Sequence, residues 1–330
     1  MMSKSPFLEH IRQVLRTKHY SIQTEKSYLA WIKRFIIFHH KRHPQDMAEQ
    51  EVSQFLTYLA VQRGVTASTQ NLALCAIVFM YKHIFSRELT LLDDTVRAKA
   101  PKRVPVVLSN NEAMTIINLL KEPYRLMFLI LYGSGLRKSE LLRLRVKDID
   151  FESNSIFIFR GKGGKDRVAL LPQTIIPLIR AQISKVEDLH QQDILEGEGR
   201  TSLPTGLARK YPYAITDIKW QYIFPSRNRC QHPVDGYFCR HHLHWTSLTK
   251  ELRKAVIKSG IRKHVTAHTF RHSFATQLLL NGTDIRTVQE LLGHNDLKTT
   301  QIYTHVIGQH SSCTTSPIDR NASLMNKKLQ

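Results

Sequence analysis

The sequence contains few cysteines and no long apolar run. Its cysteines are too few and too scattered over 330 residues to build a disulfide framework: Cys75, Cys230, Cys239 and Cys313. The best apolar segment, residues 126–132, is about a third of the ~20 residues that a bilayer-crossing helix needs. The N-terminal residues 1–20 lack the apolar core of a signal peptide. We therefore expect no membrane partner and a reducing, cytoplasmic location.

Acidic residues are scarce relative to basic ones. Lysine and arginine number 48 against 27 aspartates and glutamates, which gives a formal net charge of +21. This excess indicates a polyanionic partner, and it favours nucleic acid over a membrane because no amphipathic basic helix dominates the chain. Hydrophobic residues make up 42% of a chain long enough for two domains, so a disordered protein is excluded. Composition leaves open whether the protein only binds DNA or also acts on it.

Residues 1–92 are predicted to form a small helical domain. Apolar side chains recur at steps of three and four residues over 24–38, 51–61 and 68–85, the spacing of amphipathic helices. Residues 93–105 contain two prolines and little large apolar surface, which is typical of an interdomain linker. Two roles stay open for this linker, a plain tether or a segment that contacts a phosphate backbone through Arg97, Lys99, Lys102 and Arg103.

Residues 106–330 are predicted to form a second, larger domain that is mainly helical. Ser109 and Glu112 have the spacing of a capping box at a helix start. Two β-leaning runs joined by a glycine-rich segment predict a hairpin over 155–171. Helices are predicted at 125–132, at 136–146 and from about residue 265 onward. The stretch 189–245 is irregular in pattern and exceeds what a minimal domain needs.

Four short segments carry residues suited to chemistry: 133–144, 161–167, 268–276 and 291–305. Each has an ordinary interpretation when taken alone. The first is similar to a phosphate-binding loop, but it lacks the glycine before Lys138 and a preceding strand. His268 and His272 have a zinc-compatible spacing, but no glutamate lies between them and Arg271 would repel a cation.

Together, the four segments supply a nucleophile and the donors that a phosphodiester needs. Arg137 and Arg271 are fork-shaped, permanently charged groups that can clamp its non-bridging oxygens in a more negative transition state. The imidazoles of His268, His294 and, as a further candidate, His272 add donors. Tyr303 becomes a nucleophile once its proton is removed or its oxyanion is stabilised.

Two further side chains complete this hypothesis. Lys162, on the hairpin tip, is a candidate general acid for the leaving 5′ oxygen. Glu140 lies one helical turn after Arg137 and is suited to orient a neighbour rather than to bind a metal ion. No carboxylates cluster near these segments as a Mg²⁺-dependent nuclease requires.

These segments resemble the tyrosine recombinase (phage integrase) family. The signature of that family is an arginine after a glycine-rich turn, a hairpin lysine, His-x-x-Arg, a later histidine or tryptophan, and a tyrosine nine residues on. In this sequence the matching residues are Arg137, Lys162, His268, Arg271, His294 and Tyr303, with Glu140 at the acidic position of the family.

The resemblance implies a fold, a reaction and an assembly. The fold is mainly α with a small β-hairpin or sheet in the catalytic domain, in a two-domain C-shaped clamp around DNA. The reaction is transesterification without metal or cofactor, through a 3′-phosphotyrosyl link to a DNA strand. Strand exchange implies a homotetramer on DNA, in a bacterial cytoplasm. A catalytically inactive DNA-binding relative is the alternative, and the full set of catalytic positions disfavours it.

Within the stretch 189–245 lie the segments LARKYP (207–212) and WQYIFPS (220–226), followed by Arg240, His241 and His242. These segments resemble the insertion of integron integrases, which move gene cassettes between attI- and attC-type sites. The resemblance implies that this insertion handles folded single-stranded hairpins with protruding bases. Flat side chains can stack on such bases, and each stacked base contributes about 1–3 kcal/mol to binding. The candidates for these contacts are Phe159, Trp220, Pro233, His241 and His242, although Phe159 stands where we expect a tryptophan. An ordinary phage- or chromosome-type integrase with an unusual insertion is the alternative.

A zinc site is a rival interpretation of the same stretch. Six potential ligands fall within it: Cys230, His232, Cys239, His241, His242 and His244. Their spacing is not a common zinc-finger pattern, so we expect no metal ion. The integron resemblance accounts for His241 and His242 but not for the two cysteines.

Overall fold

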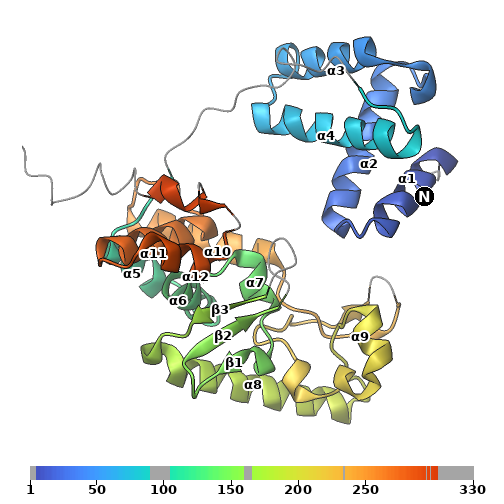
Figure 1. Ribbon diagram of the computed structural model, residues 1–330. Helices are drawn as coiled ribbons and strands as arrows, with labels where there is room; N and C mark the ends of the chain where they lie inside the picture. Colours follow the sequence, from blue (N-terminus) through green and yellow to red (C-terminus); the bar gives the residue numbers. More distant parts are fainter. Residues whose placement is uncertain are drawn as a thin grey trace, which may run out of the picture. The chain divides into compact units, whose positions relative to one another are not determined.

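The computed structural model describes residues 5–89, 105–159, 166–232, 235–294, 296–297 and 299–303. Within these residues the protein is mainly helical with small antiparallel sheets, as the sequence predicted (Figure 1). The chain divides into two compact units between Arg103 and Val104. A search of the described helices finds none with the length and apolarity needed to cross a membrane.

The first unit is a bundle of helices around one apolar core. Its helices are α1 (Pro6–Thr17), α2 (Ile22–Phe38), α3 (Glu49–Val61) and α4 (Ala67–Ile84). The three predicted helices are confirmed as α2, α3 and α4, while α1 was not predicted. Ile11 and Leu15 of α1 are fully buried in the core, and Phe7, Leu8 and Val14 pack against it. Glu25 of α2 pairs with Arg12 and Arg16 on the polar side of α1. An apolar face and ion pairs therefore attach α1 to the rest of the bundle.

The second unit has its own apolar core, built mainly from helices. These are α5 (Asn110–Asn118), α6 (Tyr124–Ser134), α7 (Lys138–Arg143), α8 (Ile176–Leu195), α10 (Trp245–Ser259), α11 (Ala267–Leu280) and α12 (Ile285–Leu292). The predicted capping box at Ser109 and Glu112 is confirmed at the start of α5. The helix predicted at 136–146 is shorter, because α7 ends at Arg143 and a short 3₁₀ turn, Val146–Asp148, follows Arg145.

A three-stranded sheet lies beside these helices. It contains β1 (Ile149–Asp150), β2 (Ser155–Ile158) and β3 (Arg167–Leu170), and β2 pairs antiparallel with both neighbours. The predicted hairpin is confirmed by the register of β2 and β3, in which Ile158 faces Arg167. Ile156 and Ile158 point into the core of the unit, while Arg167 begins β3 next to α12.

The stretch predicted to be irregular is partly regular. Residues 189–195 are the end of α8, so that part of the prediction is wrong: His190 and Asp193 extend the buried side of this helix beyond the core that Ile179 and Ile183 occupy. Beyond α8 the chain forms α9 (Thr205–Lys210), the 3₁₀ turns Pro212–Ile215 and Ile218–Trp220, and the strands β4 (Cys230–Gln231) and β5 (Phe238–Cys239).

Candidate active site

Arg137 and Glu140 form the first part of the site, at the start of α7. Arg137 is the N-cap residue, and Glu140 accepts its backbone N–H at 2.8 Å and its Nη1 at 2.7 Å. Arg167 of β3 donates to the same carboxylate at 2.5 Å. The Glu140 side chain is only 5% exposed, so one buried carboxylate holds two guanidinium groups. This contact joins the glycine turn after α6 to the β-hairpin.

The carboxylate of Glu140 stays ionised in this position. Burial acts to raise the pKa of Glu140, but the charge of Arg167 and the hydrogen bonds and charge of Arg137 outweigh it and lower the pKa. Glu140 therefore neutralises one of the two guanidinium charges and fixes the direction of Arg137, whose Nη2 donates to Gly293 O at 3.0 Å.

Arg271 occupies the interior of the second unit on α11. Its Nη1 donates to Gly135 O at 2.6 Å and its Nη2 donates to Leu292 O at 2.5 Å. Burial, together with the nearby charge of Arg137, lowers the pKa of Arg271 to about 9. Arg271 therefore connects the turn after α6 with the end of α12, and it lies in the field of Arg137.

Tyr303 packs next to α11, in a cluster with Phe274, Val288 and Leu292. Its hydroxyl lies 2.9 Å from Nδ1 of His272, and only 1% of the residue is exposed. Burial raises the pKa of Tyr303, while the positive charges of Arg271 and Arg137 act in the opposite direction. The phenol is therefore held as a neutral group within reach of an imidazole and in the field of two arginines.

The imidazoles of His272 and His294 flank Tyr303. The His294 ring stacks on the tyrosine with centroids 6.3 Å apart, and its Nδ1 is hydrogen-bonded to Thr300 Oγ1 at 2.9 Å. Burial and neighbouring positive charges lower the pKa of both histidines to about 4. Both rings are therefore neutral at pH 7, and a neutral ring nitrogen can accept the phenolic proton.

The chain matches two known family models. The model described as the phage integrase family matches residues 106–310, and the model described as the phage integrase N-terminal SAM-like domain matches residues 7–91. The chain belongs to the phage integrase family. The family includes tyrosine recombinases, and the protein is a site-specific recombinase enzyme.

Similar proteins cover nearly the whole chain. An integrase/recombinase from Escherichia coli is 40% identical over 321 residues, which cover 97% of this chain and 95% of the relative. The tyrosine recombinase XerA of Pyrococcus furiosus is 30% identical and covers 93% of this chain, with 92% of its own length matched. The crystal structure of the XerH site-specific recombinase is similar in fold, with a TM-score of 0.61, 22% identity, and coverage of 97% of this chain and 84% of XerH.

The second unit of this recombinase gathers most of the predicted catalytic residues. Arg137, Glu140, Arg271, His294 and Tyr303 lie around the end of α6, the start of α7, the first turns of α11 and the end of α12. His268 is an exposed residue on α11, with its ring centroid 6.5 Å from that of His272. Lys162 lies outside the described residues, as do the predicted DNA contacts Pro233, Arg97, Lys99, Lys102 and Arg103.

Sequence reasoning missed Arg167 and left His272 undecided. Arg167 bonds Glu140 and also donates from Nη1 to Leu291 O at 2.8 Å, so it is part of the framework of the site. An arginine directly after a glycine-rich hairpin tip suggests an exposed position, and its partner Glu140 is distant in the sequence. The sequence left open whether His272 contacts DNA or only packs, and its contact in the structure is the hydroxyl of Tyr303.

The predicted base contacts, three in the insertion and Phe159 on the β-hairpin, differ in accessibility where the structure describes them. Phe159 is 51% exposed at the end of β2. Trp220 is half-buried, with Lys147 Nζ 4.5 Å from its ring centroid. His241 is hydrogen-bonded to Ser202 Oγ at 2.9 Å, and His242 donates from Nδ1 to Leu243 O at 2.7 Å. The two histidines are therefore held in place by the protein before any base arrives.

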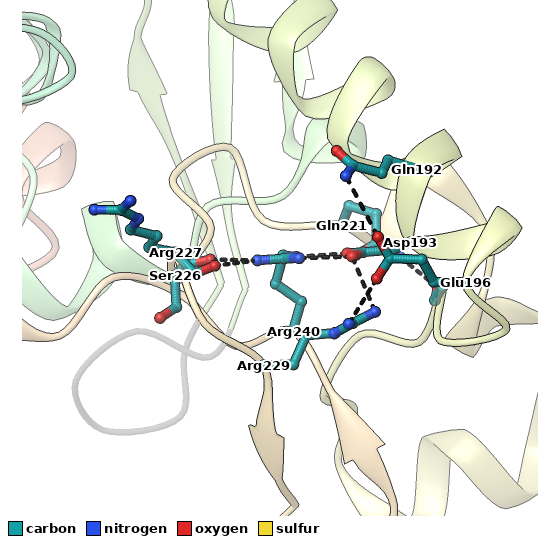
Figure 2. A network of polar contacts seen from close by, with 9 residues as sticks. Gln192, Asp193, Glu196, Gln221, Ser226, Arg227, Arg229 and Arg240 are labelled. Carbon is teal, nitrogen blue, oxygen red and sulfur yellow. Dashed lines mark hydrogen bonds and ion pairs between the residues drawn. The ribbon is translucent and has the colours of Figure 1, made fainter.

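An ion-pair network fastens the insertion to α8 (Figure 2). Asp193 accepts from Arg240 Nε at 2.5 Å and from Arg240 Nη2 at 2.6 Å, and it pairs with Arg229 at 3.4 Å. Arg240 Nη1 also donates to the backbone carbonyls of Ser226 and Arg227, each at 2.8 Å. One buried carboxylate thus holds the two arginines that flank β4 and β5.

The potential zinc ligands of the insertion have other partners. His241 contacts Ser202, and His232 Nδ1 accepts the backbone N–H of Asp235 at 3.1 Å. Across the parts of the chain that the structure describes, no group of three or more His, Cys, Asp or Glu side chains is arranged to hold a metal ion.

Proposed function

We propose that Tyr303 attacks a DNA phosphate and forms a 3′-phosphotyrosyl link, which a 5′-hydroxyl of the partner strand later reverses. The observation that carries this proposal is the position of the buried phenol, 2.9 Å from a neutral imidazole and in the field of Arg137 and Arg271. The new phosphorus–oxygen bond replaces the one that is broken, so the reaction needs no external energy source. The two guanidinium groups stabilise the extra negative charge of the pentacoordinate phosphorus.

His272 is the group that receives the phenolic proton in this proposal. Its Nδ1 is in hydrogen-bonding reach of the Tyr303 hydroxyl, and its low pKa keeps the nitrogen free of a proton at pH 7. The pentacoordinate phosphorus gains negative charge in the transition state. This charge raises the proton affinity of the imidazole, because it stabilises an imidazolium. His268, His294 and Lys162 are proposed to donate to phosphate oxygens and to the leaving 5′ oxygen.

A nicked DNA site tests the chemistry, because the short cleaved strand diffuses away and leaves the covalent adduct trapped. We expect Tyr303→Phe to abolish the adduct while DNA binding stays within about twofold, since only a hydroxyl is removed. A matched control is Tyr213→Phe, because Tyr213 is 90% exposed on the insertion and outside the site. An adduct formed by Tyr303→Phe at the wild-type rate would show that another residue is the nucleophile.

We further propose that the substrates are gene-cassette sites of the attI and attC type, including folded single-stranded hairpins, and that four protomers assemble on them. The insertion supports this proposal because it presents a partly exposed tryptophan and two fixed imidazoles. Phe159, at the end of β2, adds an exposed ring on the same basic unit. Flat faces of this kind suit extruded bases.

The shape of the substrate is tested by comparing recombination on a folded single-stranded site with the same site as duplex. We expect recombination of the folded form to exceed that of the duplex at least tenfold, because each stacked base contributes ~1–3 kcal/mol. Trp220→Ala and His242→Ala are expected to lower folded-site use with little change on duplex. Equal use of both forms would instead identify an ordinary phage- or chromosome-type integrase.

A further inference from the structure

Two cysteines face each other across the hairpin of the insertion. Cys230 of β4 is paired directly with Cys239 of β5 in the antiparallel register. Directly opposed residues in such a ladder have Cα atoms about 4.5–5.5 Å apart, which lies inside the ~4.4–6.8 Å range of disulfides. Their side chains project from the same face of the two strands, and the Cys239 thiol has Cys230 as a hydrogen-bonding neighbour. The two cysteines are therefore close enough for a disulfide to join them after a small approach of the strands.

The surrounding contacts hold this register. The backbone N–H of His232 donates to Tyr237 O at 2.8 Å, and the two rings stack with centroids 4.7 Å apart. Arg229, just before Cys230, and Arg240, just after Cys239, both pair with the buried Asp193 (Figure 2). The carboxylate of Asp193 therefore holds both strands of the hairpin at the residues next to the two cysteines. The two sulfur atoms can separate only if these ion pairs break.

The two thiols differ in access to solvent. Cys230 is exposed, whereas Cys239 is fully buried. Burial and the neighbouring Cys230 raise the pKa of Cys239 to about 12. Only the Cys230 thiol is thus open to a reagent from solution, and the Cys239 thiol is within reach of whatever forms on Cys230.

We propose that Cys230 and Cys239 are a redox-modification site, which a small-molecule disulfide oxidises to an intramolecular disulfide bond. In the first step the Cys230 thiolate attacks one sulfur of the small disulfide and expels a small thiolate. In the second step Cys239 loses its proton and attacks Cys230 Sγ, which expels the second small thiolate. Two protein thiols and one small disulfide become one protein disulfide and two small thiols, so atoms and electrons balance.

The disulfide has a consequence for DNA that rests on the proposed function. Arg240, His241 and His242 follow Cys239 directly, and His241 and His242 are proposed base contacts. A sulfur–sulfur bond of about 2.05 Å draws β5 toward β4 and fixes the strand from which these histidines emerge. In the reduced protein Ser202 and the backbone carbonyl of Leu243 hold His241 and His242, and the new bond shifts both rings from these positions. The oxidised protein is therefore expected to use folded single-stranded sites several-fold less than the reduced protein.

Peptide mapping tests the bond directly. The full chain is treated with oxidised glutathione, free thiols are alkylated in acid denaturant, and the protein is digested with trypsin. Cleavage after Arg229 and Arg240 yields one peptide, residues 230–240, that contains both cysteines. We expect this peptide to be two hydrogen atoms lighter and unalkylated. The exposed Cys75 on the first unit is the internal control, and it is expected to carry glutathione or alkyl instead.

A variant separates the disulfide from simple thiol reactivity. Cys239→Ser is expected to stop at a mixed disulfide between Cys230 and glutathione, because the second thiol is missing. A wild-type peptide that is doubly alkylated, or that carries glutathione on Cys230 beside an alkylated Cys239, would overturn the proposal.

The functional consequence is measured on the same preparations. Oxidised wild-type protein is expected to lose folded-site recombination several-fold and to regain it with dithiothreitol, while Cys230→Ser stays unaffected by oxidation. Unchanged activity in protein whose peptide 230–240 is fully bridged would refute the regulatory role. Failure of the reduced protein to use folded sites would instead refute the substrate proposal and leave the peptide result standing.

Discussion

Glu140 lies between two guanidinium groups in the interior of the second unit. It accepts from Arg137 at 2.7 Å and from Arg167 at 2.5 Å. A buried ion pair is not by itself a large source of stability, but the removal of one partner leaves an uncompensated buried charge. The removal of Glu140 would leave two uncompensated guanidinium charges, and Arg137 would lose the contact that fixes its direction.

Glu140→Gln is therefore expected to lower the free energy of unfolding by about 3 kcal/mol and adduct formation by roughly tenfold or more. Urea unfolding of the full chain and the nicked-site assay measure the two effects. Glu187→Gln is the matched control, since Glu187 is exposed on α8, and it should change stability by less than about 0.5 kcal/mol. A Glu140→Gln variant as stable and active as its control would refute the role of this carboxylate.

The histidines around Tyr303 predict a dependence of stability on pH. His272 and His294 have pKa values of about 4 in the folded protein against an ordinary 6.5, because they are buried near positive charges. Between these values the unfolded chain binds more protons than the folded one, so stability rises with pH through this window. The stability that the two neutral histidines contribute is fully present above pH 6.5 and is lost as the pH falls toward 4.

Urea unfolding at a series of pH values measures this effect. His272→Asn is expected to flatten part of the slope between pH 6.5 and 4, because one proton-binding difference is removed. A slope of the wild-type size in His272→Asn would show that this histidine is not the origin of the dependence.

Gly293 ends α12 and forms part of the wall of the site. Its φ is 62°, and its carbonyl accepts from Arg137 Nη2. A Cβ atom at this position would lie 2.5 Å from Cδ of Arg167 and 2.9 Å from its Nε. The turn therefore needs glycine for its backbone conformation and also for the space that Arg167 takes.

Gly260 provides a matched comparison at the end of α10, because its φ is 70° and a Cβ there would meet nothing within 4 Å. Gly260→Ala is expected to cost about 1 kcal/mol from the backbone alone. Gly293→Ala is expected to cost about 1–3 kcal/mol more and to lower adduct formation, since Arg167 must move. Thermal or urea unfolding of both variants decides this, and equal losses would contradict the close packing of Arg167 against Gly293.

Elements whose sequence patterns lie in neighbouring residues can be predicted from the sequence, whereas contacts between distant residues form only in the folded chain. The hairpin over 155–171 and the capping box at Ser109 depend on adjacent residues, and both are confirmed. The helix α1 was missed although its signal is also local, because Phe7, Leu8, Ile11, Val14 and Leu15 recur at helical spacing and pack in or against the core. Arg167 was missed because its role depends on Glu140 and Leu291, which lie far away in the chain and meet only in the folded unit.

The charge of the whole molecule predicts how DNA binding responds to salt. A net charge of +21 implies that several cations neutralise phosphates and release counterions on binding. With six to ten such contacts, the affinity for duplex should fall by roughly 10³–10⁵ between about 50 and 200 mM salt. Fluorescence anisotropy titrations measure this, with Tyr303→Phe expected to give the same slope because it removes no cation. A fall of less than about tenfold would contradict a large phosphate-binding surface.

The proposed 3′-phosphotyrosyl link is tested most directly by identifying the amino acid that carries DNA in the trapped complex. Nuclease digestion of the complex leaves a short nucleotide on the protein, and mass spectrometry of the peptides locates it. We expect the nucleotide to be joined through its 3′ phosphate to Tyr303. A nucleotide found on any other residue, or joined through a 5′ phosphate, would contradict it.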